Sequence, residues 1–209
     1  MKKTDAGNTS IVPYIPTGLS TVSTSIQATD KILFERVEYY LNQGFAKYDL
    51  KDFQGAIDDF TKAIEIVPGY ANIYYYRGVS KYDLMEYEDA IEDYTKAIEI
   101  DPNYAYALNN RGIARYDSKD YQGAIEDYSK AIGINPKFAY AYNNRGIAKF
   151  DLMEYQESIE DFSKAIEIYP DYANAYYNRG DAKKTLGDPR GALVDYDRYN
   201  NLRKNDSVK

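Results

Sequence analysis

Residues 108–115 read L-N-N-R-G-I-A-R and residues 142–149 read Y-N-N-R-G-I-A-K, so the same segment returns after 34 residues. The period continues along most of the chain. It places prolines at Pro68, Pro102, Pro136 and Pro170, and glycines at Gly44, Gly78, Gly112, Gly146 and Gly180. Such self-similarity is typical of stacked supersecondary units, none of which buries its apolar face alone. We therefore expect a repeat array without a single central core.

Each repeat contains the pattern of two amphipathic helices. With positions numbered 1 to 34 from Val37, the repeats begin at Val37, Ala71, Ala105, Ala139 and Ala173. The first helix is expected at positions 1–14 and the second at positions 17–30. Glycine at position 8 and a small residue at position 20 allow the two helices to approach closely, and an aromatic ring at position 24 fills the space between them. Proline at position 32 prevents the second helix from continuing.

These residues resemble the tetratricopeptide repeat: an aromatic residue at position 4, Gly at 8, Ala at 20, an aromatic residue at 24, Ala at 27 and Pro at 32. The resemblance covers Val37 to about Arg203. It implies an all-α fold, a right-handed α-solenoid of antiparallel helix pairs, whose first helices line a concave face that grips peptides. The chain departs from the family by carrying Arg at position 7 in four repeats, where Leu is commoner.

Three segments are expected. Residues 1–28 are rich in Ser and Thr and predict a flexible tail, residues 29–204 hold the five repeats, and residues 205–209 form a polar tail. Asp30 is expected to cap the first helix, and Asp188 followed by Pro189 to begin the last one. Because the end of the last helix is polar, we expect this helix to cap the array.

The composition disfavours several classes of function. The chain has no His and no Cys, which removes the commonest metal ligand, the commonest general base, thiol nucleophiles and thiolate metal sites. Its net charge of −7, from 26 basic and 33 acidic residues, is opposite to that of a nucleic-acid binder. No apolar run is long enough to span a membrane, and Met1-Lys2-Lys3 is followed by polar residues where a signal peptide would be apolar. We expect no enzymatic activity, no cofactor, no metal, no membrane insertion and a cytoplasmic location.

The candidate binding face collects amides, rings and aliphatic side chains at positions 2, 5, 6, 9 and 12 of the first helices. Amides bond the backbone of an extended peptide, while rings cover its apolar side chains. The alternative is a solvated face that binds nothing. The candidate peptide-binding residues are Tyr75, Tyr82, Tyr106, Asn109, Asn110, Ile113, Tyr116, Tyr140, Asn143, Asn144, Ile147, Phe150, Tyr177 and Asn178.

The resemblance also allows us to ask whether the chain binds the C-terminal tails of heat-shock chaperones. Family members that bind the acidic C-terminal tails of heat-shock chaperones use Asn at position 6 together with cations at positions 2, 5 and 6. Asn110, Asn144 and Asn178 match the amides, but Tyr75 and Asn143 stand at position 5 where a lysine is needed. The sequence therefore disfavours chaperone tails.

Two charged rows recur in the repeats. Asp49, Asp83, Asp117 and Asp151 at position 13 either favour a neutral or basic ligand or form a solvated row. Arg77, Arg111, Arg145 and Arg179 at position 7 either bind phosphate or, as we expect, pair with the aspartates at position 23 of the facing helix, since a partly buried guanidinium needs a partner.

The sequence thus predicts a protein-interaction scaffold that binds an extended, neutral-to-basic peptide segment of a partner protein in a groove lined by Tyr and Asn. The alternative is a self-assembling structural protein that forms homo-oligomers through its groove, tail or terminal repeats. A further hypothesis is that the apolar segment Ile11–Pro16 occupies the groove.

Overall fold

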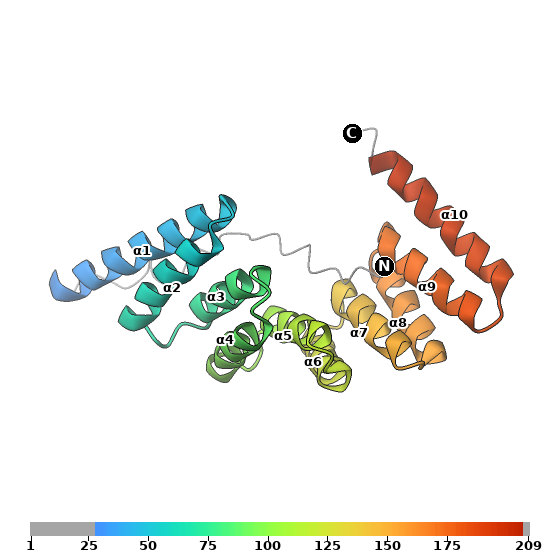
Figure 1. Cartoon of the computed structure of the whole chain (residues 1–209), viewed down its shortest axis with the longest axis horizontal. Coiled ribbons are helices and arrows are strands. Elements are labelled where there is room, and N and C mark those ends of the chain that lie inside the picture. The colour runs from blue at the N-terminus through green and yellow to red at the C-terminus, as the bar shows by residue number, and fades with distance from the viewer. Residues whose placement is uncertain (1–27, 207–209) are drawn as a thin grey trace. The chain divides into compact units, whose positions relative to one another are not determined.

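The computed structural model describes residues 28–206, and all of its regular structure there consists of α-helices (Figure 1). The bounds are α1 Ala28–Asp49, α2 Phe53–Ile66, α3 Ala71–Asp83, α4 Tyr87–Ile100, α5 Ala105–Asp117, α6 Tyr121–Ile134, α7 Ala139–Asp151, α8 Tyr155–Ile168, α9 Ala173–Thr185 and α10 Pro189–Asp206. The hypothesis about Ile11–Pro16, and all of the expected tail except residue 28, lie outside the described residues.

The helices pack as consecutive pairs in two compact units. In residues 28–102, α1 packs with α2, α3 with α4, and α2 with α3. In residues 103–206, the pairs are α5 with α6, α7 with α8 and α9 with α10, and each second helix contacts the next first helix. The first helix α7 also contacts α5 on one side and α9 on the other, so the three first helices form one layer. The all-α fold of helix pairs expected from the sequence is confirmed.

The helix bounds follow the repeat positions closely. Each of α2, α4, α6 and α8 begins at position 17 and ends at position 30, as expected. The first helices α3, α5, α7 and α9 end at position 13, one residue earlier than expected. At the ends of the array, α1 already begins at Ala28, before the expected cap Asp30, and α10 continues to Asp206.

Glycine at position 8 sets the distance between the two helices of a pair. A Cβ atom added to Gly112 would lie 2.6 Å from Tyr128 Cε1, and one added to Gly146 would lie 2.7 Å from Phe162 Cε1. These distances are far below van der Waals contact, so any side chain at position 8 would push the aromatic ring at position 24 away. The close approach expected from the sequence is confirmed.

The turn after each first helix uses a left-handed residue at position 15. Gly187 has φ 86°, but Lys51, Met85, Lys119 and Met153 adopt φ between 62° and 72° although they carry side chains. The backbone hydrogen bonds from Met85 N to Tyr82 O and from Glu86 N to Lys81 O close this turn over the end of α3. The side chains of Met85 and Met153 are about three-quarters exposed.

The second helices start with different caps in alternate repeats. The carboxylates of Asp52, Asp120 and Asp188 accept hydrogen bonds from the backbone N–H groups three residues later, which confirms the expected cap of α10. In α4 and α8 the equivalent residues are Glu86 and Glu154, whose side chains make no such bond. No helix within residues 28–206 is both long and apolar enough to cross a membrane.

Candidate functional site

The fourteen candidate side chains differ widely in exposure. Tyr106 and Tyr177 are exposed, at 55% and 37%, whereas Tyr82, Tyr116, Tyr140 and Phe150 are half-buried. The remaining eight are buried: Tyr75, Asn109, Asn110, Ile113, Asn143, Asn144, Ile147 and Asn178. Twelve of the fourteen belong to α5, α7 and α9, whose contacts bring them onto one layer. Tyr75 and Tyr82 belong to α3 in the other unit.

The asparagines of α5, α7 and α9 form what we call the amide face, which consists of Asn109, Asn110, Asn143, Asn144 and Asn178. Side-chain amides connect neighbouring repeats across this face. Asn144 Nδ2 donates to Asn109 Oδ1 at 3.3 Å, and Asn178 Nδ2 donates to Asn143 Oδ1 at 3.0 Å. Asn109 Nδ2 in turn donates to Asn110 Oδ1 at 3.2 Å. The amides are therefore held in fixed orientations by one another.

Two polar atoms of the amide face have no hydrogen-bond partner within the described part of the chain. They are Asn143 Nδ2 and Asn144 Oδ1, a donor and an acceptor on adjacent residues of α7. Both side chains are 0% exposed, so water does not compensate for the missing bonds. A buried polar group without a partner costs about 1–3 kcal/mol of stability. The face thus holds an unused donor and acceptor at its centre.

Aromatic rings flank the amide face. The ring of Tyr106 lies edge-on to Phe138, with centroids 5.1 Å apart, and Tyr140 lies in the same way against Tyr172. Tyr177 contacts Tyr196 and Tyr199 of α10. The half-buried rings at position 12 pack on the rings at position 17 of the same repeat, and Phe150 on Tyr155 is an example. The position-12 rings therefore serve helix packing as well as lining the face.

The first unit carries rings where the second carries amides. Positions 5 and 6 of α3 hold Tyr75 and Tyr76, both buried. Tyr76 lies 4.7 Å from Phe45 and Tyr75 lies 5.9 Å from Tyr94, measured between ring centroids. The repeats therefore do not offer one uniform surface, and the polar part of the candidate site lies on α5, α7 and α9.

The arginines at position 7 pair internally, as expected, and are committed to the aspartates of the facing helices. Arg145 Nε and Nη2 bond the two carboxylate oxygens of Asp161 at 2.9 and 2.6 Å, and its Nη1 donates to Ser129 Oγ of the preceding repeat at 3.0 Å. Arg77 and Arg179 repeat this arrangement with Asp93 and Asp195, and Arg111 is paired with Asp127. The interpretation as phosphate ligands is not supported, because these guanidinium groups already have carboxylate partners.

A second cation on each aspartate was not foreseen from the sequence. Position 11 holds Lys81, Arg115, Lys149 and Lys183, and each bonds the aspartate at position 23 at 2.7–2.9 Å. The sequence does indicate this second cation, because positions 7 and 11 lie four residues apart and therefore face the same side of a helix. Burial acts to raise the pKa of Asp195, but the bonds from Arg179 and Lys183 outweigh it and hold that pKa below 3.8.

The aspartates at position 13 have a structural role that neither interpretation included. Tyr48 Oη donates to Asp83, and Tyr116 Oη donates to Asp151, in each case from one repeat to the next. Burial, and then the bond to Asp151, raises the pKa of the Tyr116 hydroxyl. These carboxylates are therefore fixed in place by tyrosines, and their charge remains available to attract a basic ligand.

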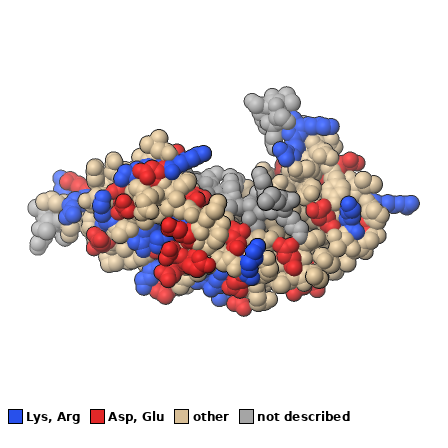
Figure 2. All heavy atoms as spheres, viewed as in Figure 1, with Lys and Arg blue, Asp and Glu red and all other residues tan. Residues whose placement is uncertain are grey.

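Figure 2 shows both acidic and basic side chains on the same face of the molecule. Among the side chains that the structure describes, no group of three or more acidic residues is arranged to hold a metal ion. The candidate side chains thus provide hydrogen-bonding groups, ring surfaces and negative charge, and such groups bind ligands.

Models of one family match much of the chain. Those described as "Tetratricopeptide repeat" match residues 37–70, 71–104, 93–126 and 139–172, and one described as "TPR repeat" matches residues 112–153. A comparison with curated protein sequences gave no match.

Several solved structures share the fold. A crystal structure of MamA protein is 26% identical with a TM-score of 0.73, and the alignment covers 83% of this chain and 95% of that one. PilF of Pseudomonas aeruginosa is 23% identical with a TM-score of 0.74, covering 81% and 78% of the two chains. YrrB, described as a TPR protein with an unusual peptide-binding site, is 20% identical with a TM-score of 0.67, covering 85% and 93%.

Proposed function

The chain belongs to the tetratricopeptide repeat family, and on that premise we propose that it binds an extended, neutral-to-basic peptide segment of a partner protein along the amide face. The family and its structural neighbours support the broader role of a protein-interaction scaffold. That YrrB is described as having a peptide-binding site supports a peptide as the ligand.

The observation that carries the proposal is the unused donor and acceptor at the centre of the amide face, Asn143 Nδ2 and Asn144 Oδ1. An extended peptide offers a backbone C=O and N–H at every non-proline residue. Both atoms are covered in the free chain, so the proposal requires that peptide binding uncovers them. A backbone C=O and N–H would then satisfy both atoms and recover the cost of leaving them unpaired. A ligand that offers only apolar surface would leave both atoms unpaired.

Rings and charge support the same ligand. Tyr106 of α5 and Tyr177 of α9 leave ring surface exposed on helices that carry the amides, and these rings would cover apolar side chains of the peptide. The carboxylate of Asp151 and the net charge of −7 would favour a neutral or basic segment over an acidic one.

The test is a selection of random displayed peptides on the full chain, followed by affinity measurement with the double variant Asn143→Leu, Asn178→Leu. This pair removes both partners of one amide bond, so that neither amide is left newly unpaired and folding is preserved. We expect a loss of affinity of about 10-fold or more. The matched control is Asn200→Leu, which changes an exposed amide of α10 and should bind normally. Unchanged binding by the double variant would contradict the proposed site.

Self-assembly is the second candidate, favoured by the end of the array. Leu193 of α10 is 62% exposed, although the isoleucines at the equivalent position of earlier repeats are covered at least in part. Val194 beside it is 68% exposed, at a position where the earlier repeats carry Asp or Glu. Light scattering across a concentration range, on the wild type and on Leu193→Lys, tests this role. A monomer at every concentration would rule it out.

A further inference from the structure

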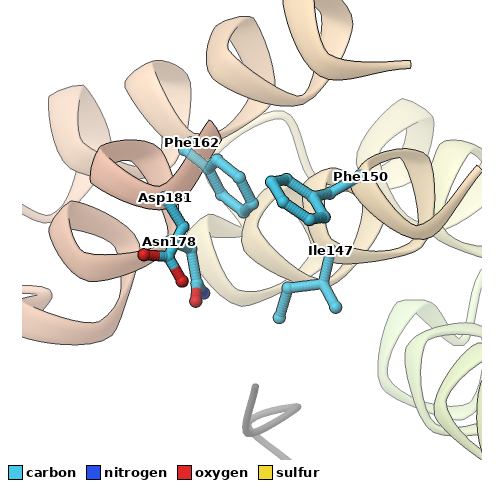
Figure 3. A pocket seen from close by; sticks show the side chains of 5 residues that line it. All are labelled: Ile147, Phe150, Phe162, Asn178 and Asp181. Atoms are coloured by element: carbon cyan, nitrogen blue, oxygen red, sulfur yellow. The ribbon is translucent and has the colours of Figure 1, made fainter. Parts of the chain in front are cut away.

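A small hollow opens beside the amide face, between α7, α8 and α9. It is lined by Ile147, Phe150, Phe162, Asn178 and Asp181. It is a shallow depression, because the space of about 170 Å³ around it includes open solvent and both Ile147 and Phe162 are only 1% exposed. In Figure 3 the rings of Phe150 and Phe162 lie side by side, with Asp181 and Asn178 on one side of them and Ile147 on the other. Asn178 belongs both to this hollow and to the amide pair with Asn143. A peptide bound along the amides would therefore pass the mouth of the hollow.

Asp181 is the unusual member of this set. It stands at position 9, where the earlier repeats place the buried side chains of Val79, Ile113 and Ile147. Its Oδ1 accepts a hydrogen bond of 2.7 Å from Tyr196 Oη, and Oδ2 has no partner in the described part of the chain. A carboxylate thus replaces an aliphatic side chain at the edge of an apolar hollow.

The charge of Asp181 is not neutralised by the cations of its own helix. Arg179 and Lys183 both bond Asp195 instead, at 2.6 and 2.7 Å. The negative charge acts on the neighbouring rings, because Coulombic repulsion from Asp181 raises the pKa of the Tyr177 hydroxyl. The mouth of the hollow therefore places the half-buried ring of Phe150 beside an anion that no cation of its own helix pairs with, and these surroundings favour a cation on an aliphatic stem.

We propose that one lysine or arginine side chain of the bound peptide lies across the mouth of this hollow, with its stem against the half-buried ring of Phe150 and its charged end on Asp181. The inference rests on the proposed function and adds a basic residue at one fixed position of the ligand. Specificity then comes from Asp181, while the amides hold the backbone at any sequence.

The experiment is the same selection of random displayed peptides, carried out in parallel on the wild type, Asp181→Ile and Asp181→Asn. Isoleucine is the residue of two earlier repeats at this position, and asparagine keeps an acceptor for Tyr196 while removing the charge. We expect peptides selected by the wild type to share one Lys or Arg. Replacing it by norleucine should weaken binding roughly 10-fold to the wild type and much less to either variant. The Asp181→Ile protein should select an aliphatic residue there.

The control is Asp197→Ile, which removes an equal charge from an exposed position of α10 that does not line the hollow. It should retain the basic preference. Selected peptides without a shared basic residue, an unchanged preference in both Asp181 variants, or an equal change in the control would each overturn the inference. If no version enriches any peptide, the proposed function fails and this inference fails with it.

Discussion

Removal of the Asp127 carboxylate tests how much the internal ion pairs stabilise the array. Asp127 is 0% exposed and accepts three charge-assisted bonds: Arg111 Nε at 2.8 Å, Arg111 Nη2 at 2.7 Å and Arg115 Nη1 at 2.9 Å. Breaking a buried pair by removing one partner costs about 3–5 kcal/mol, because the other charge stays buried. The Arg111 side chain is 10% exposed, but that of Arg115 is 25% exposed and can turn to water. We therefore expect Asp127→Ala to lower the free energy of unfolding by about 3 kcal/mol.

The first repeat supplies a matched control at the same position. Asp59 is also buried, but position 7 of that repeat is Gln43, and the partners of Asp59 are Lys47 and Lys62. Their side chains are 35% and 49% exposed, so both ammonium groups regain water when the acid is removed. Asp59→Ala should therefore cost only about 1 kcal/mol.

The measurement is a urea titration of the full chain followed by far-ultraviolet circular dichroism, with both variants compared with the wild type at neutral pH. The predicted difference between Asp127→Ala and Asp59→Ala is about 2 kcal/mol, well above the error of such titrations. Equal losses in the two variants would refute the argument, because it depends on the guanidinium of Arg111 being unable to reach water.

Two further predictions concern the turns and the pH dependence of stability. Met85→Gly and Met153→Gly should each raise the free energy of unfolding by up to about 1 kcal/mol in urea titrations, because the two residues have φ of 63° and 64° and their side chains are exposed. A lower free energy of unfolding in both variants would show that these side chains make stabilising contacts. Asp195→Asn should destabilise the protein at neutral pH, since the folded-state pKa of Asp195 lies below 3.8 and the ionised form is the one that Arg179 and Lys183 stabilise. That stabilisation is complete above about pH 4 and is lost as the pH falls through the folded-state pKa of Asp195. The difference in the free energy of unfolding between the variant and the wild type should therefore shrink only below about pH 4. A difference that already shrinks near pH 6 would contradict the assignment.

Contacts within one repeat were predictable from the sequence. The pairing of Gly112 with the ring of Tyr128, and of Arg145 with Asp161, joins two helices of the same repeat. Their relative placement is fixed by a short turn and by a pattern that recurs in phase. The cation at position 11 belongs to this class as well, and a count of helical neighbours four residues apart would have found it.

Contacts between repeats were not predictable in the same way. The bonds from Tyr116 to Asp151 and from Asn178 to Asn143 join residues 35 apart, one period and one residue. The sequence shows which face of a helix these side chains share, but not how closely the next helix approaches that face. For this reason the burial of Asn143 and Asn144 was not foreseen, and their part in peptide binding stays a prediction.

The arginines at position 7 also bear on how the number of repeats can change. Arg77, Arg145 and Arg179 each bond an aspartate 16 residues ahead and a hydroxyl group 16 residues behind. Duplication or deletion of 34 residues in register keeps both spacings at every new junction, so each guanidinium retains its carboxylate and its hydroxyl. An insertion of another length within one of the paired helices would shift the register of an arginine against its partners and leave a partly buried charge short of a partner. The ion pairs therefore allow the array to grow or shrink by whole repeats and oppose changes of length within the paired helices.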